Sequence, residues 1–383
     1  MSHNDLELTS RLVHSGQDRD PFTGASSVPI YQASTFAQPD PDHPGAYDYS
    51  RSRNPTRDAL EKSIAELEGG THGFAFGSGM AAISAAFFML KAGDHVIAPE
   101  DVYGGTYRIL TTLLKQWGLT TTFVDMTYPE RMAQAVLPNT KAIFVETPSN
   151  PLLKITDLDA VVAIARRHDL LTIIDNTFPT PFLQRPIEHG FDIVLHSATK
   201  FIGGHSDVIA GLGVTRTAEL GRRMKAVQNS VGSILGPQDS WITLRGLRTL
   251  AVRMEAQQRA AQMIAEELTT WPQIVKVHYP GLKDHPGRTL NERQSSGPGA
   301  VLSFELKDAP AALRTLAGVK LCFPGVSLGG VESILSYPSR MSHAAMPTEE
   351  RHARGITDGL LRLSAGLEDP NDILKDLQQA MGG

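Results

Sequence analysis

Several features that define other classes of protein are scarce in this chain of 383 residues. Its one cysteine, Cys322, excludes an intrachain disulfide and suits a reducing compartment, so we expect a cytoplasmic protein. No segment reaches the roughly 18 consecutive apolar residues of a membrane span, and the opening MSHNDLELTS lacks the apolar core of a signal peptide. The formal net charge of −5 is spread along the chain, which argues against a nucleic-acid or membrane partner.

Two kinds of binding motif are also missing. A G-x-G-x-x-G fingerprint with its following acid is absent, which disfavours an NAD-dependent oxidoreductase, and a Walker loop is absent as well. His205 and His343 have no ligand partners at zinc-like spacing, so we expect hydrogen-bonded histidines and no metal site.

The remaining composition indicates a large globular chain. Apolar residues make up 41% of it, enough for two domains of unequal size. Residues 1–56 are rich in Pro, Gly, Ser and Asp without helical or strand period, which predicts an N-terminal arm ordered only against another surface. We predict a large α/β domain over residues 57–247 and a smaller α+β domain over residues 248–383.

Short apolar runs alternate with helical segments in the large domain. The expected strands are 95–99, 121–126, 142–147, 171–175, 191–197 and 208–215, and the expected helices include 79–91, 104–117 and 157–168. Such alternation predicts a mostly parallel sheet covered by helices on both faces. A long helical stretch from about 238 to 269 should lead into the second domain, where VLSFEL at 301–306 is a strand.

Because ligands of parallel sheets collect at the carboxyl ends of the strands, the residues just past each apolar run are the candidates for binding and chemistry. FGSGMAA at 76–82 opens a helix whose first N–H groups suit a phosphate, although a Gly-Ser-Gly is more often a plain turn. Asp175 ends the run LTIID and could serve a ligand or equally cap the next helix. In SATK, the hydroxyls of Ser197 and Thr199 stand just before Lys200. An amine, an acid and an anion site at strand ends are the groups that pyridoxal phosphate requires, so Lys200 is the expected Schiff-base lysine.

An ordered set of motifs supports this hypothesis: YDYSRSRNPTRDALE, GSGMAA, EDVYGGTYR, ETPSNP, IIDNTFPTP, SATKFIGGHSDVIAG, SLGGVESILSYP and RLSAGLED. In this order the chain resembles the Cys/Met-metabolism family of pyridoxal-phosphate enzymes over nearly its whole length. The resemblance implies the fold-type I architecture, a large cofactor domain with a smaller C-terminal domain and an extended N-terminal arm.

The resemblance also implies a role for each matching residue. Lys200 and Tyr103 would be catalytic, with Tyr103 stacked on the pyridine ring and Asp175 on its nitrogen. Asn150, Ser327 and Arg362 would bind the substrate, Arg362 by its carboxylate. The phosphate would be held by Gly79, Met80, Ser197 and Thr199, and by Tyr49 and Arg51 of a neighbouring subunit. An obligate dimer, usually paired into a tetramer, follows from this last assignment.

The family contains several reactions, and three positions bear on the choice. Val326 precedes SLGG where many γ-lyases and γ-synthases carry Glu, and VESILSYPSRMSHAAMP looks most like bacterial β-lyases. Gly105 stands where methionine γ-lyases typically carry Cys. We therefore expect cystathionine β-lyase activity, with a cystathionine γ-lyase or homocysteine desulfhydrase, a γ-synthase and a non-catalytic binding module as alternatives. Arg53 replaces the usual Gly, and we expect it at the mouth of the site or in solvent.

Overall fold

The computed structural model describes residues 6–16, 19–40 and 42–382. Residues 1–5, 17–18 and 41 of the expected arm lie outside this description. Within the described residues the chain forms two sheets, one of seven strands and one of five. None of the helices in these ranges is both long and apolar enough to cross a bilayer.

The large sheet has the strand order β1-β7-β6-β5-β4-β2-β3. The strands are β1 (His72–Phe76), β2 (His95–Pro99), β3 (Thr120–Val124), β4 (Thr140–Glu146), β5 (Leu171–Asp175), β6 (Ile193–Ser197) and β7 (Gly211–Thr215). Strands β2 to β6 pair in parallel, whereas β7 is antiparallel to both β6 and β1. The expectation of a mostly parallel α/β sheet is confirmed.

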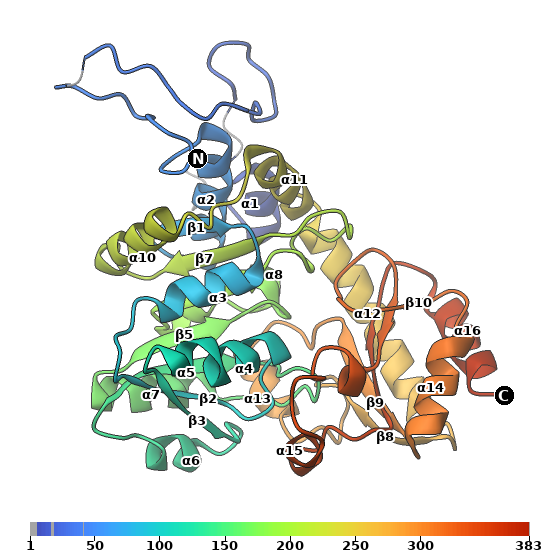
Figure 1. Cartoon of the computed structure of the whole chain (residues 1–383). Helices are drawn as coiled ribbons and strands as arrows, with labels where there is room; N and C mark the ends of the chain where they lie inside the picture. The colour runs from blue at the N-terminus through green and yellow to red at the C-terminus, as the bar shows by residue number, and fades with distance from the viewer. Residues whose placement is uncertain (1–5, 17–18, 41, 383) are drawn as a thin grey trace.

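Helices cover both faces of this sheet (Figure 1). Side chains of α3 (Gly79–Phe87), α4 (Gly104–Thr111) and α10 (Ala218–Val231) pack in the core on one face. Those of α2 (Pro55–Glu68), α7 (Leu158–His168) and α11 (Pro237–Leu247) pack in the core on the other. Shorter helices complete this half of the chain: α1 (Leu8–His14), α5 (Leu113–Gln116), α6 (Pro129–Gln134), α8 (Thr180–Leu183) and α9 (Pro186–His189).

The second sheet has the order β10-β11-β12-β9-β8. Its strands are β8 (Ile274–His278), β9 (Val301–Leu306), β10 (Phe323–Pro324), β11 (Ile334–Ser336) and β12 (Leu360–Ser364). Its core is shared with α12 (Leu250–Leu268), α14 (Ala309–Gly318) and α16 (Pro370–Ala380). The elements α13 (Arg288–Gln294), the 3₁₀ turn Pro338–Arg340 and α15 (Thr348–Ala353) lie between these strands in the chain. The domain boundaries near residues 56 and 247 stay a prediction.

Several features of the chain differ from the sequence expectations. Strand β1 is not among the expected strands, and the helix expected over 104–117 is divided into α4 and α5. The arm contains a helix, α1, whose Leu12 is buried in the core of the large domain. The stretch predicted as one helix from about 238 to 269 is two helices, because α11 ends at Leu247 and α12 begins at Leu250. At this break a Cβ on Gly246 would lie 2.5 Å from the carbonyl oxygens of Ile202 and Gly203, so the helix end packs directly on the loop that follows Lys200.

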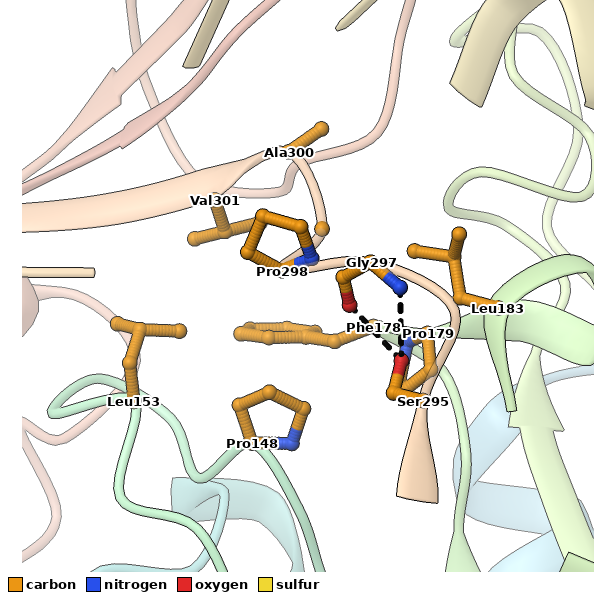
Figure 2. A pocket seen from close by; sticks show the side chains of 11 residues that line it. Pro148, Leu153, Phe178, Pro179, Leu183, Ser295, Gly297, Pro298, Ala300 and Val301 are labelled. Carbon is orange, nitrogen blue, oxygen red and sulfur yellow. Dashed lines mark hydrogen bonds between the residues drawn. The ribbon is translucent and has the colours of Figure 1, made fainter. Parts of the chain in front are cut away.

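The loops that follow β4 and β5 meet the segment that leads into β9 around a small apolar void. Its volume is about 10 Å³, room for about one water. Figure 2 shows the ring of Phe178 between Pro148 and Pro298, with the Ser295 hydroxyl donating to the carbonyl of Gly297 over 2.8 Å. Pro148 and Phe178 also line a larger cleft beside this void, so the packing supports the wall of that cleft.

Candidate active site

A cleft of about 480 Å³ lies at the carboxyl ends of β4, β5 and β6, beside the N-terminus of α3. This is a normal size for a small-molecule site. Ten of the sequence-predicted site residues line it: Gly79, Met80, Tyr103, Asn150, Asp175, Ser197, Thr199, Lys200, Ser327 and Arg362. Segments from both sheets, far apart in the chain, thus meet in one cavity.

Lys200 lies in the turn after β6 and is largely withdrawn from solvent. Its Nζ donates to the hydroxyl of Ser327 over 2.6 Å. Burial, and then repulsion by Arg362, lowers the pKa of Lys200 to about 8, although Asp175 opposes the shift. A substantial fraction of this amine is therefore neutral near physiological pH, the form in which nitrogen is a nucleophile and a base.

Two carboxyl groups stand side by side at the ends of adjacent strands, because Glu146 of β4 pairs in register with Asp175 of β5. Burial raises the pKa of Asp175, and hydrogen bonds from Thr177 act against this rise. Burial and then the charge of Asp175 raise the pKa of Glu146 well above its usual value. We therefore assign the proton to Glu146 and the negative charge to Asp175.

Glu146 was missed by the sequence reasoning. The signal was present, since the runs AIFVE and LTIID both end in an acid, and adjacent parallel strands bring such ends together. Its Oε2 accepts the backbone N–H of Tyr103 over 2.9 Å, which ties β4 to the start of α4.

Tyr103 lies on the wall of the cleft with its ring over Gly105. A Cβ at position 105 would lie 2.5 Å from Cε1 of Tyr103 and 2.8 Å from the sulfur of Met80. The glycine therefore permits the position of this aromatic ring, which is free to stack on a flat ligand in the cleft.

The N-terminus of α3 faces the same space. Ser78 caps the helix by accepting the N–H of Ala81 over 3.1 Å, so the N–H groups of Gly79 and Met80 belong to the first turn, where no intrahelical partner exists. A Cβ on Gly79 would lie 2.7 Å from Cβ of Ser197, so the glycine lets the helix end approach β6. Together with the hydroxyl of Ser197 this forms an anion site. The Thr199 hydroxyl lines the cleft but also donates to Ala210 O over 3.2 Å.

Arg362 of β12 is buried on the opposite side of the cleft. Its Nη1 donates to Asn150 Oδ1 over 2.8 Å, and its Nη2 donates to Ser327 O over 2.7 Å. Its buried Nε has no hydrogen-bond partner within the described ranges. Burial lowers the pKa of Arg362 to about 10, which leaves it charged at neutral pH and suited to a carboxylate ligand.

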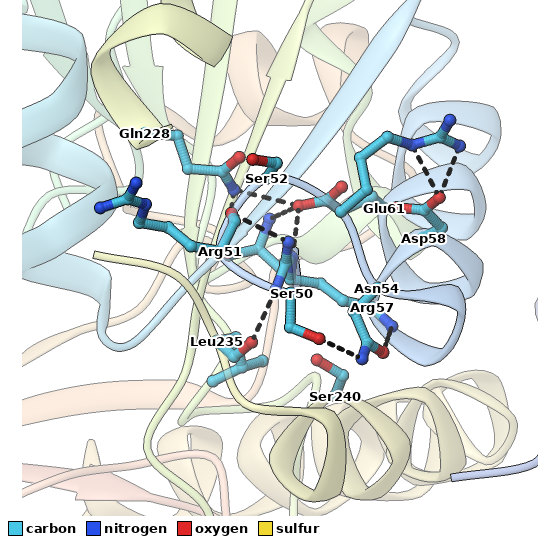
Figure 3. Close-up of polar contacts among 12 residues, drawn as sticks. Ser50, Arg51, Ser52, Asn54, Arg57, Asp58, Glu61, Gln228, Leu235 and Ser240 are labelled. Carbon is cyan, nitrogen blue, oxygen red and sulfur yellow. Dashed lines mark hydrogen bonds and ion pairs between the residues drawn. The ribbon is translucent and has the colours of Figure 1, made fainter. Parts of the chain in front are cut away.

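Tyr49 and Arg51 are not brought into this cleft. Both lie in the arm, where the guanidinium of Arg51 is 5.5 Å from the ring centre of Tyr49. Figure 3 shows the side chain of Arg51 directed away from the hydrogen-bonded group around Arg57 and Glu61. Their expected role in the site of a neighbouring subunit stays a prediction.

Three further residues differ from, or add to, the sequence expectations. The guanidinium of Arg53 is paired with Asp58 over 2.6 Å and lies 5.0 Å from the ring centre of Tyr47, so it is not at the mouth of this chain's own cleft. His205 Nδ1 is 2.8 Å from Gly203 O, and His343 Nδ1 is 2.9 Å from Ser342 Oγ. The parts of the chain that the structure describes contain no group of three potential metal ligands.

These observations fit pyridoxal phosphate on the chemistry of the donor set. The cleft combines an amine of lowered pKa, an ionised acid beside it, an aromatic ring on the wall and a glycine-lined helix N-terminus for the phosphate. The fold and the site are those of a fold-type I pyridoxal-phosphate enzyme.

The chain belongs to the family described as "Cys/Met metabolism PLP-dependent enzyme", whose model matches residues 9–382. It is 56% identical to cystathionine beta-lyase MetC of Bacillus subtilis over 381 residues, which covers 100% of this chain and 98% of that protein. It is 50% identical to a cystathionine gamma-lyase of Bacillus subtilis, over 98% of this chain and 99% of that protein. Among solved structures, a cystathionine gamma-lyase from Lactobacillus plantarum complexed with L-serine superposes with a TM-score of 0.96 at 46% identity, covering 98% of this chain and 99% of that one. The predicted family and cofactor are confirmed.

Proposed function

We propose that this enzyme is a carbon–sulfur lyase that converts L-cystathionine to homocysteine, pyruvate and ammonia. The observation that carries the proposal is the link between base and carboxylate site, because Ser327 accepts from Lys200 through its hydroxyl and from Arg362 through its carbonyl. An amino acid held by its carboxylate on Arg362 thus presents its Cα region to the Lys200 amine. The names of the most similar relatives support the choice of substrate.

Each residue has a distinct task in this reaction. The bound cofactor supplies the electron sink that makes the Cα proton of the substrate acidic. Asp175 provides the fixed negative charge for the cofactor ring nitrogen, and the α3 N-terminus with Ser197 holds the phosphate. Tyr103 stacks on the ring, Arg362 and Asn150 orient the substrate carboxylate, and Lys200 Nζ accepts the Cα proton.

Elimination then follows within the substrate. As the Cα proton leaves, the Cα–Cβ double bond forms and the Cβ–S bond breaks, so the electron pair departs with the sulfur. The thiolate takes up a proton and leaves as homocysteine. The remaining three-carbon enamine reacts with water to give pyruvate and ammonia.

The choice of β-elimination over γ-elimination is supported by Val326. Its side chain is 66% exposed and lines the cleft next to Ser327. An apolar side chain there offers no polar contact to the distal part of a γ-substrate.

One assay tests the proposal directly. Purified enzyme loaded with pyridoxal phosphate is given L-cystathionine, and the keto acid is identified by mass spectrometry. Pyruvate with homocysteine is expected. Formation of 2-oxobutyrate with cysteine or sulfide would identify a γ-lyase instead, and cystathionine made from an acylated homoserine would identify a γ-synthase.

We also propose that the enzyme is a cytoplasmic homotetramer built from dimers that share active sites. The exposed Tyr49 and the direction of the Arg51 side chain in Figure 3 support a contact with a second copy of the chain. The single cysteine supports a reducing compartment. The Pro-, Gly-, Ser- and Asp-rich composition of residues 1–56 and the presence of two separate sheets support the division into an arm, a large domain and a small domain at residues 56 and 247.

A further inference from the structure

A group of buried and half-buried polar side chains holds residues 49–53, which we call the arm loop. Arg57 of α2 is fully buried, and its Nη2 donates to the carbonyl oxygen of Arg51 over 3.2 Å (Figure 3). Lys225 of α10 donates through Nζ to the carbonyl oxygen of Ser52, the next residue. Two consecutive carbonyls of the arm loop are therefore bound by side-chain donors from two different helices.

The two donors are themselves fixed by the large domain. Arg57 Nε is 3.5 Å from Oε1 of Glu61, one turn further along α2. The same oxygen of Glu61 accepts the N–H of Ala75 on β1 over 2.9 Å and Nε2 of Gln228 on α10 over 3.0 Å. Gln228 Oε1 in turn accepts from Lys225 Nζ over 2.9 Å. The arm loop is thus tied to α2, α10 and β1 by one connected set of polar contacts.

The end of the arm loop is fixed by the residue that starts α2. Asn54 donates through Nδ2 to the hydroxyl of Ser50 over 3.1 Å, and its Oδ1 accepts the N–H of Thr56 over 3.0 Å as the helix N-cap. The stem of Arg51 is also placed, because a Cβ on Gly232 at the end of α10 would lie 3.6 Å from Cδ of Arg51.

These contacts hold the backbone of the arm loop and leave its functional side chains outside. Tyr49 is 47% exposed, and Arg51 is exposed as well. A buried guanidinium–carboxylate pair such as Arg57 with Glu61 adds little net stability, because the desolvation cost offsets the attraction. Its specific result here is a fixed place for the carbonyl of Arg51. A loop that is ordered in advance loses less conformational freedom when it binds, which strengthens binding.

We propose that Arg57 and Lys225 are positioning residues for the cofactor site of a neighbouring subunit. They fix the backbone of the arm loop before the two subunits meet, so that Arg51 reaches the phosphate in the partner's cleft without a cost for ordering the loop. Neither positioning residue lines the cleft of its own chain. This inference rests on the proposed function in so far as Arg51 serves that phosphate.

Two variants remove the donors from different helices. Arg57→Met combined with Glu61→Gln removes the donor to the arm loop without leaving a buried carboxylate opposite an apolar side chain. Lys225→Met removes the second donor at a half-buried position of α10. The matched control is Arg351→Met, because Arg351 is also buried and donates to a backbone carbonyl, that of Ile356 over 3.1 Å, but lines no part of the cleft.

The readout is the dissociation constant of pyridoxal phosphate, without substrate. Cofactor-free protein is titrated, and the visible absorbance of cofactor bound to Lys200 is followed. We expect the dissociation constant to rise about tenfold in Arg57→Met/Glu61→Gln, the lower end for residues that orient a ligand-binding group. We expect a severalfold rise in Lys225→Met and a change of less than twofold in the control. When either variant is combined with Arg51→Ala, binding should weaken less than twofold beyond Arg51→Ala alone, because both act through Arg51.

A mixture of subunits tests whether the effect passes to the partner. Chains with Arg57→Met/Glu61→Gln are mixed with Lys200→Ala chains, so the absorbance counts only the sites of the former, which keep Lys200. After random exchange, half of these sites face a chain with an intact arm loop. About half of the absorbance should therefore appear at the wild-type dissociation constant. Weak binding by all sites would show that Arg57 acts on its own chain's cleft and would overturn the proposal.

The remaining outcomes separate this inference from the proposed function. If Arg51→Ala weakens binding while Arg57→Met/Glu61→Gln and Lys225→Met bind as wild type, the inference is overturned and the role of Arg51 stands. Wild-type binding by Arg51→Ala would overturn both. An equal loss in Arg351→Met would also overturn the inference, since the effect would then come from general loosening of the fold. No substrate is present, so failure to cleave cystathionine would contradict the lyase assignment alone.

Discussion

At the scale of single residues, the titration of Lys200 has a direct consequence for loading of the enzyme. With a pKa of about 8, its neutral fraction rises from about one tenth at pH 7 to about nine tenths at pH 9. We predict that the rate at which cofactor-free protein takes up pyridoxal phosphate increases severalfold over this interval, followed by visible absorbance. Borohydride should then fix the cofactor on the peptide that contains Lys200, and a reduced adduct on another lysine would contradict the assignment.

Glu146 gives a second prediction at this scale. The pKa of Glu146 is raised in the folded protein. Its contribution to the stability of the fold is therefore fully present below the pKa that this side chain has in the unfolded chain, and is lost as the pH rises through its pKa in the folded protein. Glu146→Gln removes a carboxylate that would have to ionise beside Asp175. We expect the cofactor-free variant to be more stable than wild type at pH 8 by about 1 kcal/mol, roughly 2 °C in Tm, with the difference shrinking at pH 5. A variant less stable than wild type at pH 8 would show that Glu146 is ionised in the folded protein.

The residues of the cleft were predictable to the extent that each stands at the end of an apolar run. Lys200, Asp175 and Ser197 have this position, and the structure brings them into one cavity. Glu146 has it too, but a lone acid at a strand end is also a common helix cap. The contact of Lys225 with the arm loop could not be read from the sequence, because it depends on which helix lies beside β1.

At the scale of elements, local patterns predicted the strands of the large sheet well, since continuous β-branched runs are typical of buried parallel strands. Local patterns did not predict the elements whose bounds depend on tertiary contacts. The break between α11 and α12 lies where Gly246 closely approaches Ile202 and Gly203. The short strand β11 pairs with β12, and β10 in turn pairs with β11.

Arg253 of α12 allows a test of that junction. Its guanidinium donates to the carbonyl oxygens of Phe201, Ile202 and Gly246 at 2.5, 3.3 and 2.7 Å, so it fastens the helix to the loop after Lys200. Arg253→Met removes all three hydrogen bonds, and of the acceptors Gly246 O keeps the Thr249 N–H as a donor. We expect a loss of about 3 kcal/mol in the free energy of unfolding. Urea denaturation measures it, with Arg259→Met on the exposed face of the same helix as the control. Equal stability of the two variants would contradict the fastening role.

At the scale of the whole molecule, the arm poses the main question. It carries Tyr49 and Arg51, yet these residues lie away from the cleft of their own chain. It continues directly into α2, whose last residue is Glu68, so one helix connects the arm to the back of the site. A partner chain that binds the arm would therefore contact an element whose last residue accepts a hydrogen bond from Asn176, next to Asp175.

Mixing two inactive variants tests whether the arm completes a neighbouring site. Arg51→Ala should weaken retention of the cofactor phosphate, and Lys200→Ala should abolish turnover. If Arg51 serves the partner's site, a hybrid dimer has one site with both substitutions and one site with neither. After random exchange of subunits, half of the dimers are hybrids with one intact site of two, so activity should return to about a quarter of the wild-type value. If Arg51 served its own chain, each hybrid site would carry one substitution and activity would not recover. Sedimentation of the mixture verifies that dimers or tetramers form, and a fully active monomer would exclude shared sites.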